Sequence, residues 1–108
     1  MKYNIQISDK AEEDLDSIIE YLITKLKAPI FAVEFLDEFE KRIDKLRTSP
    51  KAFKIIDNDM HIIDKIRILQ IKNYLAFFVI DEKEKMVSII RVLYGRRDWL
   101  NILRIEEI

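Results

Sequence analysis

The run Tyr74–Ile80, YLAFFVI, is apolar and is bounded by Asn73 on one side and by the charged segment 81–85 on the other. A short apolar run between turn signals, rich in aromatic and β-branched residues, predicts a central strand that is buried on both faces. Ile62–Ile71 before it and Met86–Leu93 after it are also rich in β-branched residues and predict its neighbours. We therefore expect three consecutive strands, joined by a turn at Asn73 and a charged hairpin loop.

In the first half of the chain the apolar residues are spaced differently, and most of them have helical spacing. Alternating apolar residues at Tyr3, Ile5 and Ile7 predict a half-buried strand. Ser8 or Asp9 then caps a helix, which the pair Ala28-Pro29 ends. A second helix follows and ends at Thr48, Ser49 and Pro50. The two apolar stripes that predict these helices are Ala11, Leu15, Ile18, Leu22 and Leu26, and then Ala32, Leu36, Phe39, Ile43 and Leu46 with Phe35 beside them.

The short break between the helices predicts an antiparallel helical hairpin. The order strand, helix, helix and three meandering strands predicts an α+β fold, with the hairpin on one face of a single small sheet. At 108 residues, 49% hydrophobic and 36% charged, the chain is expected to form one globular domain over residues 1–108. A short helix is expected from Asp98 to Ile108, with Trp99 anchoring this tail to the domain.

Composition excludes several kinds of site. The chain has no cysteine, one histidine (His61) and one glycine (Gly95), so thiolate metal sites, paired histidine ligands and glycine-rich phosphate loops are all absent. We expect no metal and no cofactor. The sequence has no cysteine, no apolar stretch that would serve as a secretory leader and no long apolar run. We therefore expect a cytoplasmic protein with no membrane partner. Acidic residues from Glu12 to Asp16 suit the start of a helix, and Phe31, Phe35 and Phe39 have the spacing of core packing.

Basic residues of the second half are the better candidates, because residues 51–108 carry 11 basic and 9 acidic side chains. Arginine and lysine bind phosphate or other anions, and tyrosine can stack on a base or donate a proton. The alternative is structural, with Arg96 or Arg97 paired to Asp98 over apolar surface. Gly95 is expected where the backbone needs a conformation that other residues resist. The candidates are Lys65, Arg67, Lys72, Arg91, Tyr94, Arg96 and Arg97.

Three segments also resemble one known family. The ending IIRVLYGRRDWLNIL, the strand NYLAFFVIDE and the pair Ser49-Pro50, in this order of elements, resemble the RelE/ParE toxin superfamily of type II toxin–antitoxin systems. The resemblance covers essentially the whole chain, and the ending is its specific part. It implies a growth-inhibiting toxin that serves plasmid stabilisation and is neutralised by a cognate antitoxin, whose amphipathic segment lies in a groove on the toxin.

The superfamily holds two activities, and the resemblance implies a role for each candidate. In RelE-like members, which cut mRNA in the ribosomal A site, Arg97 (with Arg96) would grip the scissile phosphate. Lys65 and Arg67 would match paired basic residues, and Tyr94 stands where many relatives have histidine. Leu75 stands where such nucleases have an arginine, so one charge-stabilising group is missing.

We therefore favour a ParE-like, non-nucleolytic toxin that acts on DNA gyrase or another essential target, which it would contact through Lys72, Arg91, Arg96 and Arg97. The first alternative is a metal-independent, ribosome-dependent mRNA endonuclease (an mRNA interferase) that uses Lys65, Arg67, Tyr94 and Arg97. The second alternative is an inactive binding module on the same fold.

Overall fold

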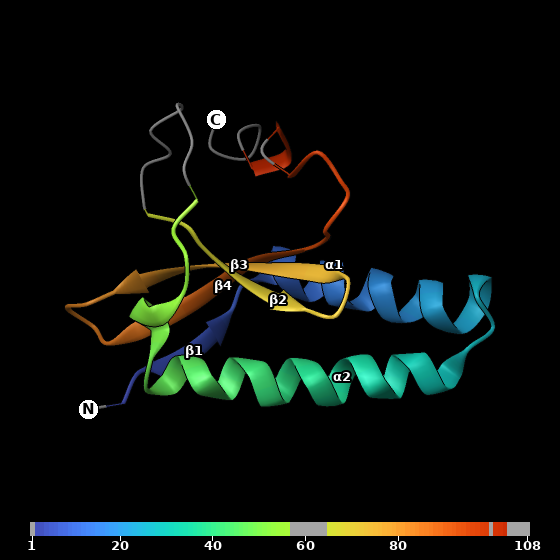
Figure 1. The fold of residues 1–108 in the computed structure, drawn as a ribbon, viewed down its shortest axis with the longest axis horizontal. Coiled ribbons are helices and arrows are strands. Elements are labelled where there is room, and N and C mark those ends of the chain that lie inside the picture. The colour runs from blue at the N-terminus through green and yellow to red at the C-terminus, as the bar shows by residue number, and fades with distance from the viewer. Residues whose placement is uncertain (1, 57–64, 100, 104–108) are drawn as a thin grey trace.

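The structure is a computed structural model that describes residues 2–56, 65–99 and 101–103. Its strands are β1 (Asn4–Ile7), β2 (Arg67–Ile71), β3 (Tyr74–Asp81) and β4 (Met86–Tyr94). Its helices are α1 (Asp9–Glu20), continued by the π-helical turn η1 (Tyr21–Lys25), and α2 (Pro29–Asp44), followed by the 3-10 turns Lys45–Arg47 and Pro50–Ala52. The expected α+β class is confirmed, with one sheet and two long helices (Figure 1).

The sheet has the order β1-β4-β3-β2. Strands β2, β3 and β4 form the expected antiparallel meander, and β3 lies between its two sequence neighbours. Strand β1 pairs in parallel with β4, with Ile5 opposite Val87, so the sheet is mixed. This long-range pairing joins the two halves of the chain, and the sequence predicted the strand without its place in the sheet.

Strand β2 is shorter than expected. The predicted strand began at Ile62, but residues 62–64 lie outside the described part of the chain, and Lys65 and Ile66 precede the strand. The backbone amide of Ile56 donates a hydrogen bond to the carbonyl of Ile66 over 2.7 Å. The segment before β2 is therefore held by the segment that follows α2.

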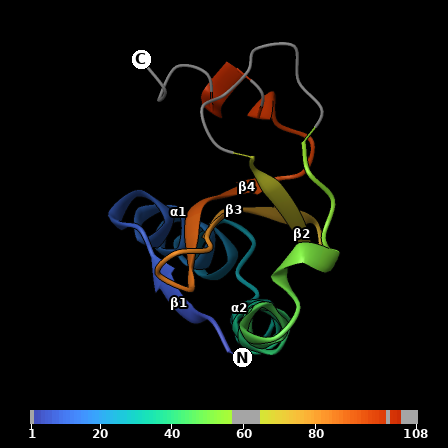
Figure 2. The same cartoon turned by 90° about the vertical axis from the view of Figure 1, so that its left-hand side faces the viewer.

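The helical hairpin covers one face of the sheet (Figures 1 and 2). The Ser8 side chain accepts a hydrogen bond from the amide of Ala11 and caps α1, and Pro29 occupies the first turn of α2. Buried residues from both helices and from the sheet form the first core. They include Ala11, Ile18, Leu22, Ala32, Phe35, Phe39, Leu46, Leu69, Ile71, Ala76, Phe78, Val87, Ile89 and Val92.

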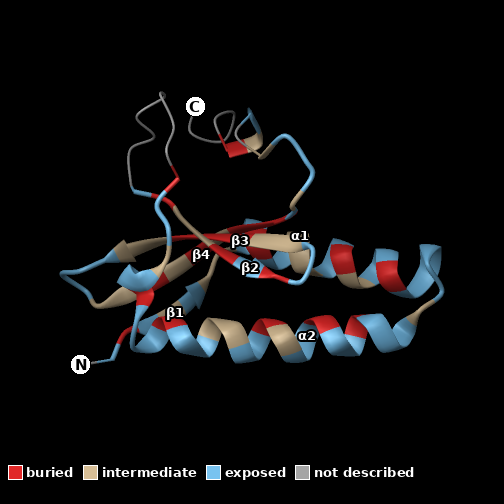
Figure 3. Ribbon diagram, viewed as in Figure 1, coloured by how far each residue is buried: buried red, intermediate tan, exposed pale blue. Residues whose placement is uncertain are grey.

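Three predicted core positions are exposed instead: Leu26, Phe31 and Leu36. The hairpin extends past the edge of the sheet, so its tip, with Leu26 and Phe31, has no strand to pack against (Figures 1 and 3). Leu36 directly follows the buried Phe35 and so lies on another side of α2. Helical spacing identifies an apolar face but does not tell how far along the helix that face stays covered. The tip thus leaves an apolar surface uncovered.

The opposite face of the sheet is covered by the segment after β4. Trp99 lies against Phe77, with their ring centroids 5.3 Å apart, and Leu103 is buried in the same cluster. This second core also contains Ile56, Ile66 and Leu93. Trp99 is therefore an anchor of the tail, as predicted. No helix in the described part of the chain is long and apolar enough to cross a membrane.

A charged cluster closes the end of the sheet where β3 turns into β4. The Tyr3 hydroxyl donates a hydrogen bond to Glu82, and the ammonium groups of Lys51 and Lys85 each lie 3.1 Å from the second oxygen of the same carboxylate. These contacts, the tyrosine first, lower the pKa of Glu82 from 4.5 to about 2. The ionised carboxylate of Glu82 thus links the residue before β1, the β3–β4 loop and the turn after α2.

A depressed pKa makes Glu82 an acid-sensitive contact. Its contribution to stability is present above the unfolded pKa of 4.5 and is lost as the pH falls through about 2, because the folded state binds protons less readily. We expect the Glu82→Gln variant to be less stable than the parent at neutral pH. The difference in the free energy of unfolding between the two proteins should disappear as the pH falls from 4.5 to about 2. Urea unfolding of both proteins across this range measures it; a gap that stays constant with pH would contradict the assignment.

Candidate functional site

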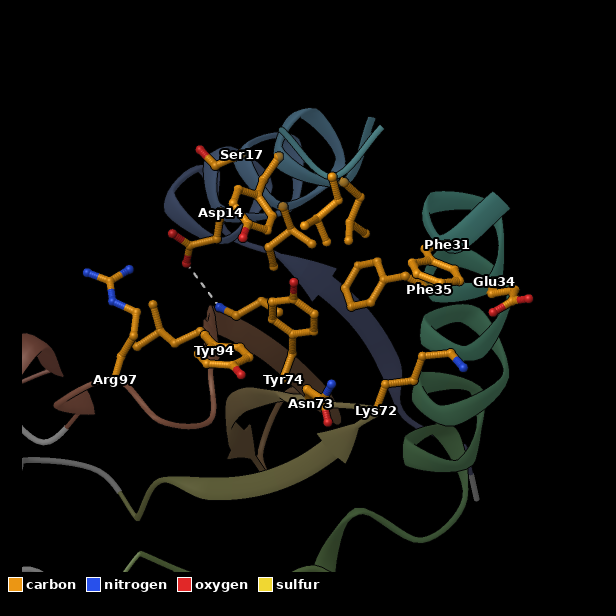
Figure 4. Close-up of a pocket in the computed structure, with 16 residues that line it drawn as sticks. Asp14, Ser17, Phe31, Glu34, Phe35, Lys72, Asn73, Tyr74, Tyr94 and Arg97 are labelled. Carbon is orange, nitrogen blue, oxygen red and sulfur yellow. Dashed lines mark hydrogen bonds between the residues drawn. The ribbon is translucent and has the colours of Figure 1, made fainter. Parts of the chain in front are cut away.

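A cavity of about 730 Å³ opens where the helical hairpin meets one end of the sheet (Figure 4). The end of β4 and the start of β3 supply Tyr94 and Tyr74, which are directly opposite each other in the register. The helices supply Tyr21 and Phe31 near the tip of the hairpin, together with the buried Phe35. The uncovered hairpin tip therefore forms one wall of the cavity, and the sheet forms its floor.

Aromatic rings dominate this floor. Tyr74 meets Phe35 edge-on at 5.1 Å and Tyr94 edge-on at 5.6 Å between ring centroids. Burial raises the pKa of Tyr74, and the neighbouring hydroxyls of Tyr21 and Tyr94 raise it further. Tyr74 is therefore a neutral hydrogen-bond donor at physiological pH, and it is not an activated base.

Two cations line the cavity. Lys72 lies in the two-residue turn between β2 and β3 with a φ of 54°, a left-handed conformation that is uncommon for lysine. Arg97 follows β4, and its amide donates to the carbonyl of Tyr94 over 3.0 Å. Neither side chain makes an ion pair within the described ranges. Asp98, which the structural alternative paired with an arginine, instead accepts a 2.6 Å hydrogen bond from Asn101.

Gly95 allows a close approach between its own backbone and that of Asn73. This differs from the expected role, which was to supply an unusual backbone conformation. Its φ is not positive, so it does not supply a backbone conformation that other residues resist. Its amide donates to the carbonyl of Asn73 over 2.9 Å, and a Cβ there would lie 3.2 Å from that same oxygen. The glycine lets the ends of β4 and of the β2–β3 turn touch.

Gly95→Ala is expected to lower the free energy of unfolding by about 1 kcal/mol, because the added methyl group pushes on the backbone of the turn. Urea unfolding measures this change. Arg96→Ala, one residue along and exposed, is the control and is expected to stay within about 0.5 kcal/mol. A Gly95→Ala protein as stable as the parent would mean that the turn yields without strain.

Arg91 does not belong to the site, contrary to the prediction. It is buried, and its guanidinium pairs with Asp14 on α1, with Nε 2.6 Å from Oδ2 and Nη2 2.8 Å from Oδ1. The amide of Val92 donates to the same carboxylate over 3.0 Å. A bulge in β4 opposite Phe77 and Phe78 interrupts the alternation of faces next to Arg91, and the ion pair with Asp14 on α1 accounts for its burial.

Lys65 and Arg67 are also not brought to the cavity. Arg67 is paired with Phe78 in the sheet, four residues along β3 from Tyr74, which is about 13 Å of strand. Its guanidinium donates to the carbonyls of Lys51 and Phe53 at 3.1 and 2.7 Å. Lys65 is exposed before the strand begins. Of the seven candidate residues, Lys72, Tyr94 and Arg97 line one cavity, and Arg96 is exposed without lining it.

Sequence reasoning missed Tyr21, Phe31 and Tyr74 as cavity residues and Asp14 as the partner of Arg91. Phe31 had been assigned to core packing and Tyr74 to a strand, and Tyr21 had been given no role. A signal for the missing acid was present, since Arg91 sits among apolar strand residues and a buried arginine needs a carboxylate. Within the described residues no group of histidine and acidic side chains is arranged to hold a metal ion.

The family model described as the ParE toxin of the type II toxin–antitoxin system parDE matches residues 5–99. Among curated proteins no match was found. The chain resembles a chain of the chromosomal ParDE toxin–antitoxin system from Pseudomonas aeruginosa, with a TM-score of 0.67 and 18% identity over 85% of this chain and 95% of that one.

Two further solved structures share the fold. One is a chain of the toxin–antitoxin complex RelBE2 from Mycobacterium tuberculosis, with a TM-score of 0.57 and 18% identity over 87% of this chain and 99% of that one. The other is a mutant of the Escherichia coli toxin RelE in the free state, with a TM-score of 0.63 and 14% identity over 100% and 99%. Since the family model spans nearly the whole domain, this chain belongs to the ParE toxin family of type II toxin–antitoxin systems, within the RelE/ParE superfamily.

Proposed function

We propose that this toxin arrests growth by acting on DNA gyrase and that it does not cleave mRNA. The observation that carries the proposal is that the four residues of the expected nuclease set are dispersed. Tyr94 and Arg97 line the cavity, whereas Arg67 is bound to two backbone carbonyls and Lys65 lies outside the sheet. Acid–base cleavage of RNA needs one group within reach of the attacking 2′-hydroxyl and another within reach of the leaving 5′-oxygen of the same phosphodiester.

The position of Leu75 supports the same proposal. Leu75 lies opposite Leu93 in the sheet and packs in the second hydrophobic core, with Phe77 and Trp99. An arginine at this position would have to replace the apolar packing that the partly buried Leu75 makes in this core. The face of the sheet that would need the missing charge is thus built as a core.

The partner of this toxin is proposed to be a cognate antitoxin. The names of the similar solved structures include toxin–antitoxin systems and complexes. In this chain, the apolar hairpin tip with Leu26 and Phe31 is continuous with the cavity, and Lys72 and Arg97 offer positive charge beside it. An acidic amphipathic segment would complement both features. Gyrase would be contacted in the cytoplasm through the exposed cations Lys72, Arg96 and Arg97.

Two measurements test the proposed target. Induction without antitoxin is expected to stop growth and to raise an SOS response, and purified toxin is expected to block supercoiling by gyrase and to accumulate cleaved DNA. Primer extension on cellular mRNA after induction is the counter-test. Cuts at fixed positions within codons would reject the gyrase proposal in favour of an mRNA interferase, and unimpaired growth of cells that make folded protein would indicate an inactive binding module.

A further inference from the structure

We propose that the helical hairpin binds a second copy of this chain through the side that is turned away from the sheet, and that the two copies form a two-fold symmetric dimer. This outer hairpin face is made by Ile19 in α1, Ile23 in η1, and Ile30, Val33 and Leu36 in α2. None of the five lines the cavity. The proposal therefore goes beyond both the action on gyrase and the antitoxin site, and its failure would leave them unchanged.

Exposed aliphatic side chains are concentrated on the outer hairpin face. Ile23, Ile30, Val33 and Leu36 are 45%, 60%, 54% and 40% exposed. Ile30, Val33 and Leu36 recur at every third residue, so they form a ridge along α2. Ile19 and Ile23 lie four residues apart on the other helix of the hairpin and form a second ridge. Contact of this much aliphatic surface with water is unfavourable, and a contiguous apolar patch marks an interaction site.

The outer hairpin face and the cavity lie on opposite sides of the hairpin. Phe31 and Phe35 line the cavity. Val33 is two residues from each of them, and two residues turn an α-helix by about 200°, so its side chain leaves α2 on the other side. In the described part of the chain the sheet lies on one side of the hairpin only (Figure 2). An antitoxin segment in the cavity and a partner on the outer hairpin face can therefore be bound at the same time.

The charges around the outer hairpin face select its occupant. Asp16, Asp37 and Glu40 are exposed acids within one helical turn of the two ridges. Lys25 and Lys27 are exposed cations at the hairpin tip. None of these five side chains makes an ion pair within the described ranges. The acids would repel a nucleic acid or an acidic peptide, whereas a second copy of the chain brings its own basic tip.

The apolar and charged patterns match themselves under a two-fold axis, as a contact between identical surfaces requires. Two antiparallel α2 helices that cross at Val33 place Ile30 of each copy opposite Leu36 of the other, because these residues are three positions before and after the crossing point. The same axis places the basic tip of each copy beside the α2 acids of the other, since Lys27 is six positions before Val33 and the acids are four and seven positions after it. Apolar side chains thus meet apolar ones, and opposite charges meet each other.

The size of the outer hairpin face predicts a weak dimer. From Lys27 to Glu40 the hairpin is about 20 Å long, and two packed helices are about 20 Å wide, which gives a footprint of about 400 Å² for each copy. This is about half the footprint of a standard protein–protein interface. We therefore expect a reversible dimer with a dissociation constant of about 10–100 µM.

Sedimentation velocity of the purified chain, at concentrations from about 5 to 200 µM, measures this association. We expect the monomer at low concentration and the dimer at high concentration, and added salt should weaken the dimer by screening its charges. A chain that stays monomeric throughout, or a mass that grows beyond two copies, would overturn the proposal. So would an outer hairpin face that is protected from hydrogen exchange only after antitoxin is added, since the antitoxin would then be its occupant.

Variants locate the interface. Val33→Glu is expected to raise the dissociation constant at least about tenfold, because the two-fold axis brings two carboxylates together, while this exposed position keeps the chain folded. Gln6→Glu, which adds the same charge at an exposed position of β1, is the control. Asp37→Lys combined with Glu40→Lys should make the basic tip repulsive, so that salt strengthens the dimer. Equal dissociation constants for Val33→Glu and Gln6→Glu, or a salt dependence that this charge reversal leaves unchanged, would overturn the proposed packing.

Discussion

Replacing Asp14 by alanine is expected to lower the free energy of unfolding by about 3–5 kcal/mol, a large part of the stability of a domain of this size. The Asp14 and Arg91 side chains are only 12% and 7% exposed, and their closest atoms lie 2.6 Å apart. Without the carboxylate, a guanidinium stays buried without its counter-charge, and the amide of Val92 loses its acceptor. Urea unfolding at constant pH measures the loss.

Asp16 offers a matched control, because it is an exposed acid on the same helix. Asp16→Ala is expected to change stability by no more than about 0.5 kcal/mol. The double variant Asp14→Leu with Arg91→Met should recover much of the loss, since two apolar side chains can replace a buried ion pair. An Asp14→Ala protein as stable as the Asp16→Ala protein would show that water reaches Arg91 and replaces the carboxylate.

The ion pair also has a consequence for the site. It ties α1 to β4 at the bulge, a few residues before the strand delivers Tyr94 and Arg97 to the cavity. Arg91, which the sequence suggested as a target contact, therefore helps to hold in place the strand that carries Tyr94 and Arg97. A loss of toxicity in an Arg91 variant must consequently be read together with its stability, and the double variant separates the two effects.

The elements of the fold were largely predictable because each rests on local chemistry. Ser8 caps α1, the pair Ala28-Pro29 separates the helices, and the apolar run Tyr74–Ile80 became the strand between two neighbours. The partner of β1 was not predictable in this way. Pairing in parallel with β4 depends on contacts between residues about eighty positions apart, and no local pattern encodes them.

The site was harder to predict than the fold for a related reason. Arg91 was placed among the target-binding cations because it stands on the last strand near Arg96 and Arg97, and the pattern along β4 does not show that Asp14 on α1 pairs with it and buries it. Arg67 occupies a strand position that looks suitable for binding, but two nearby carbonyls already use its guanidinium. Tyr94 and Arg97 were predicted correctly as neighbours because the last strand ends at this point of the sequence. Residues at the end of a strand lie at the end of the sheet, whichever residues the strand pairs with.

Replacing Phe35 by alanine is expected to lower the free energy of unfolding by about 3–5 kcal/mol, through lost burial and an unfilled cavity. Phe35 is 1% exposed, stacks on Phe39 at 6.2 Å and meets Tyr74 edge-on, so it joins α2 to the sheet at the back of the site. Chemical denaturation measures the change, and the ring of Tyr74 loses its support in the same variant.

Phe31→Ala is the matched control, because Phe31 lies one helical turn earlier and is 51% exposed. We expect it to cost less than about 1 kcal/mol, since its ring already contacts water. The two phenylalanines have the same side chain and, by their spacing, lie on the same face of α2. The difference between the losses in unfolding free energy of their alanine variants therefore shows where the sheet stops covering the hairpin. Equal losses in both variants would mean that the tip is packed in solution, and the cavity would then be closed rather than open to a ligand.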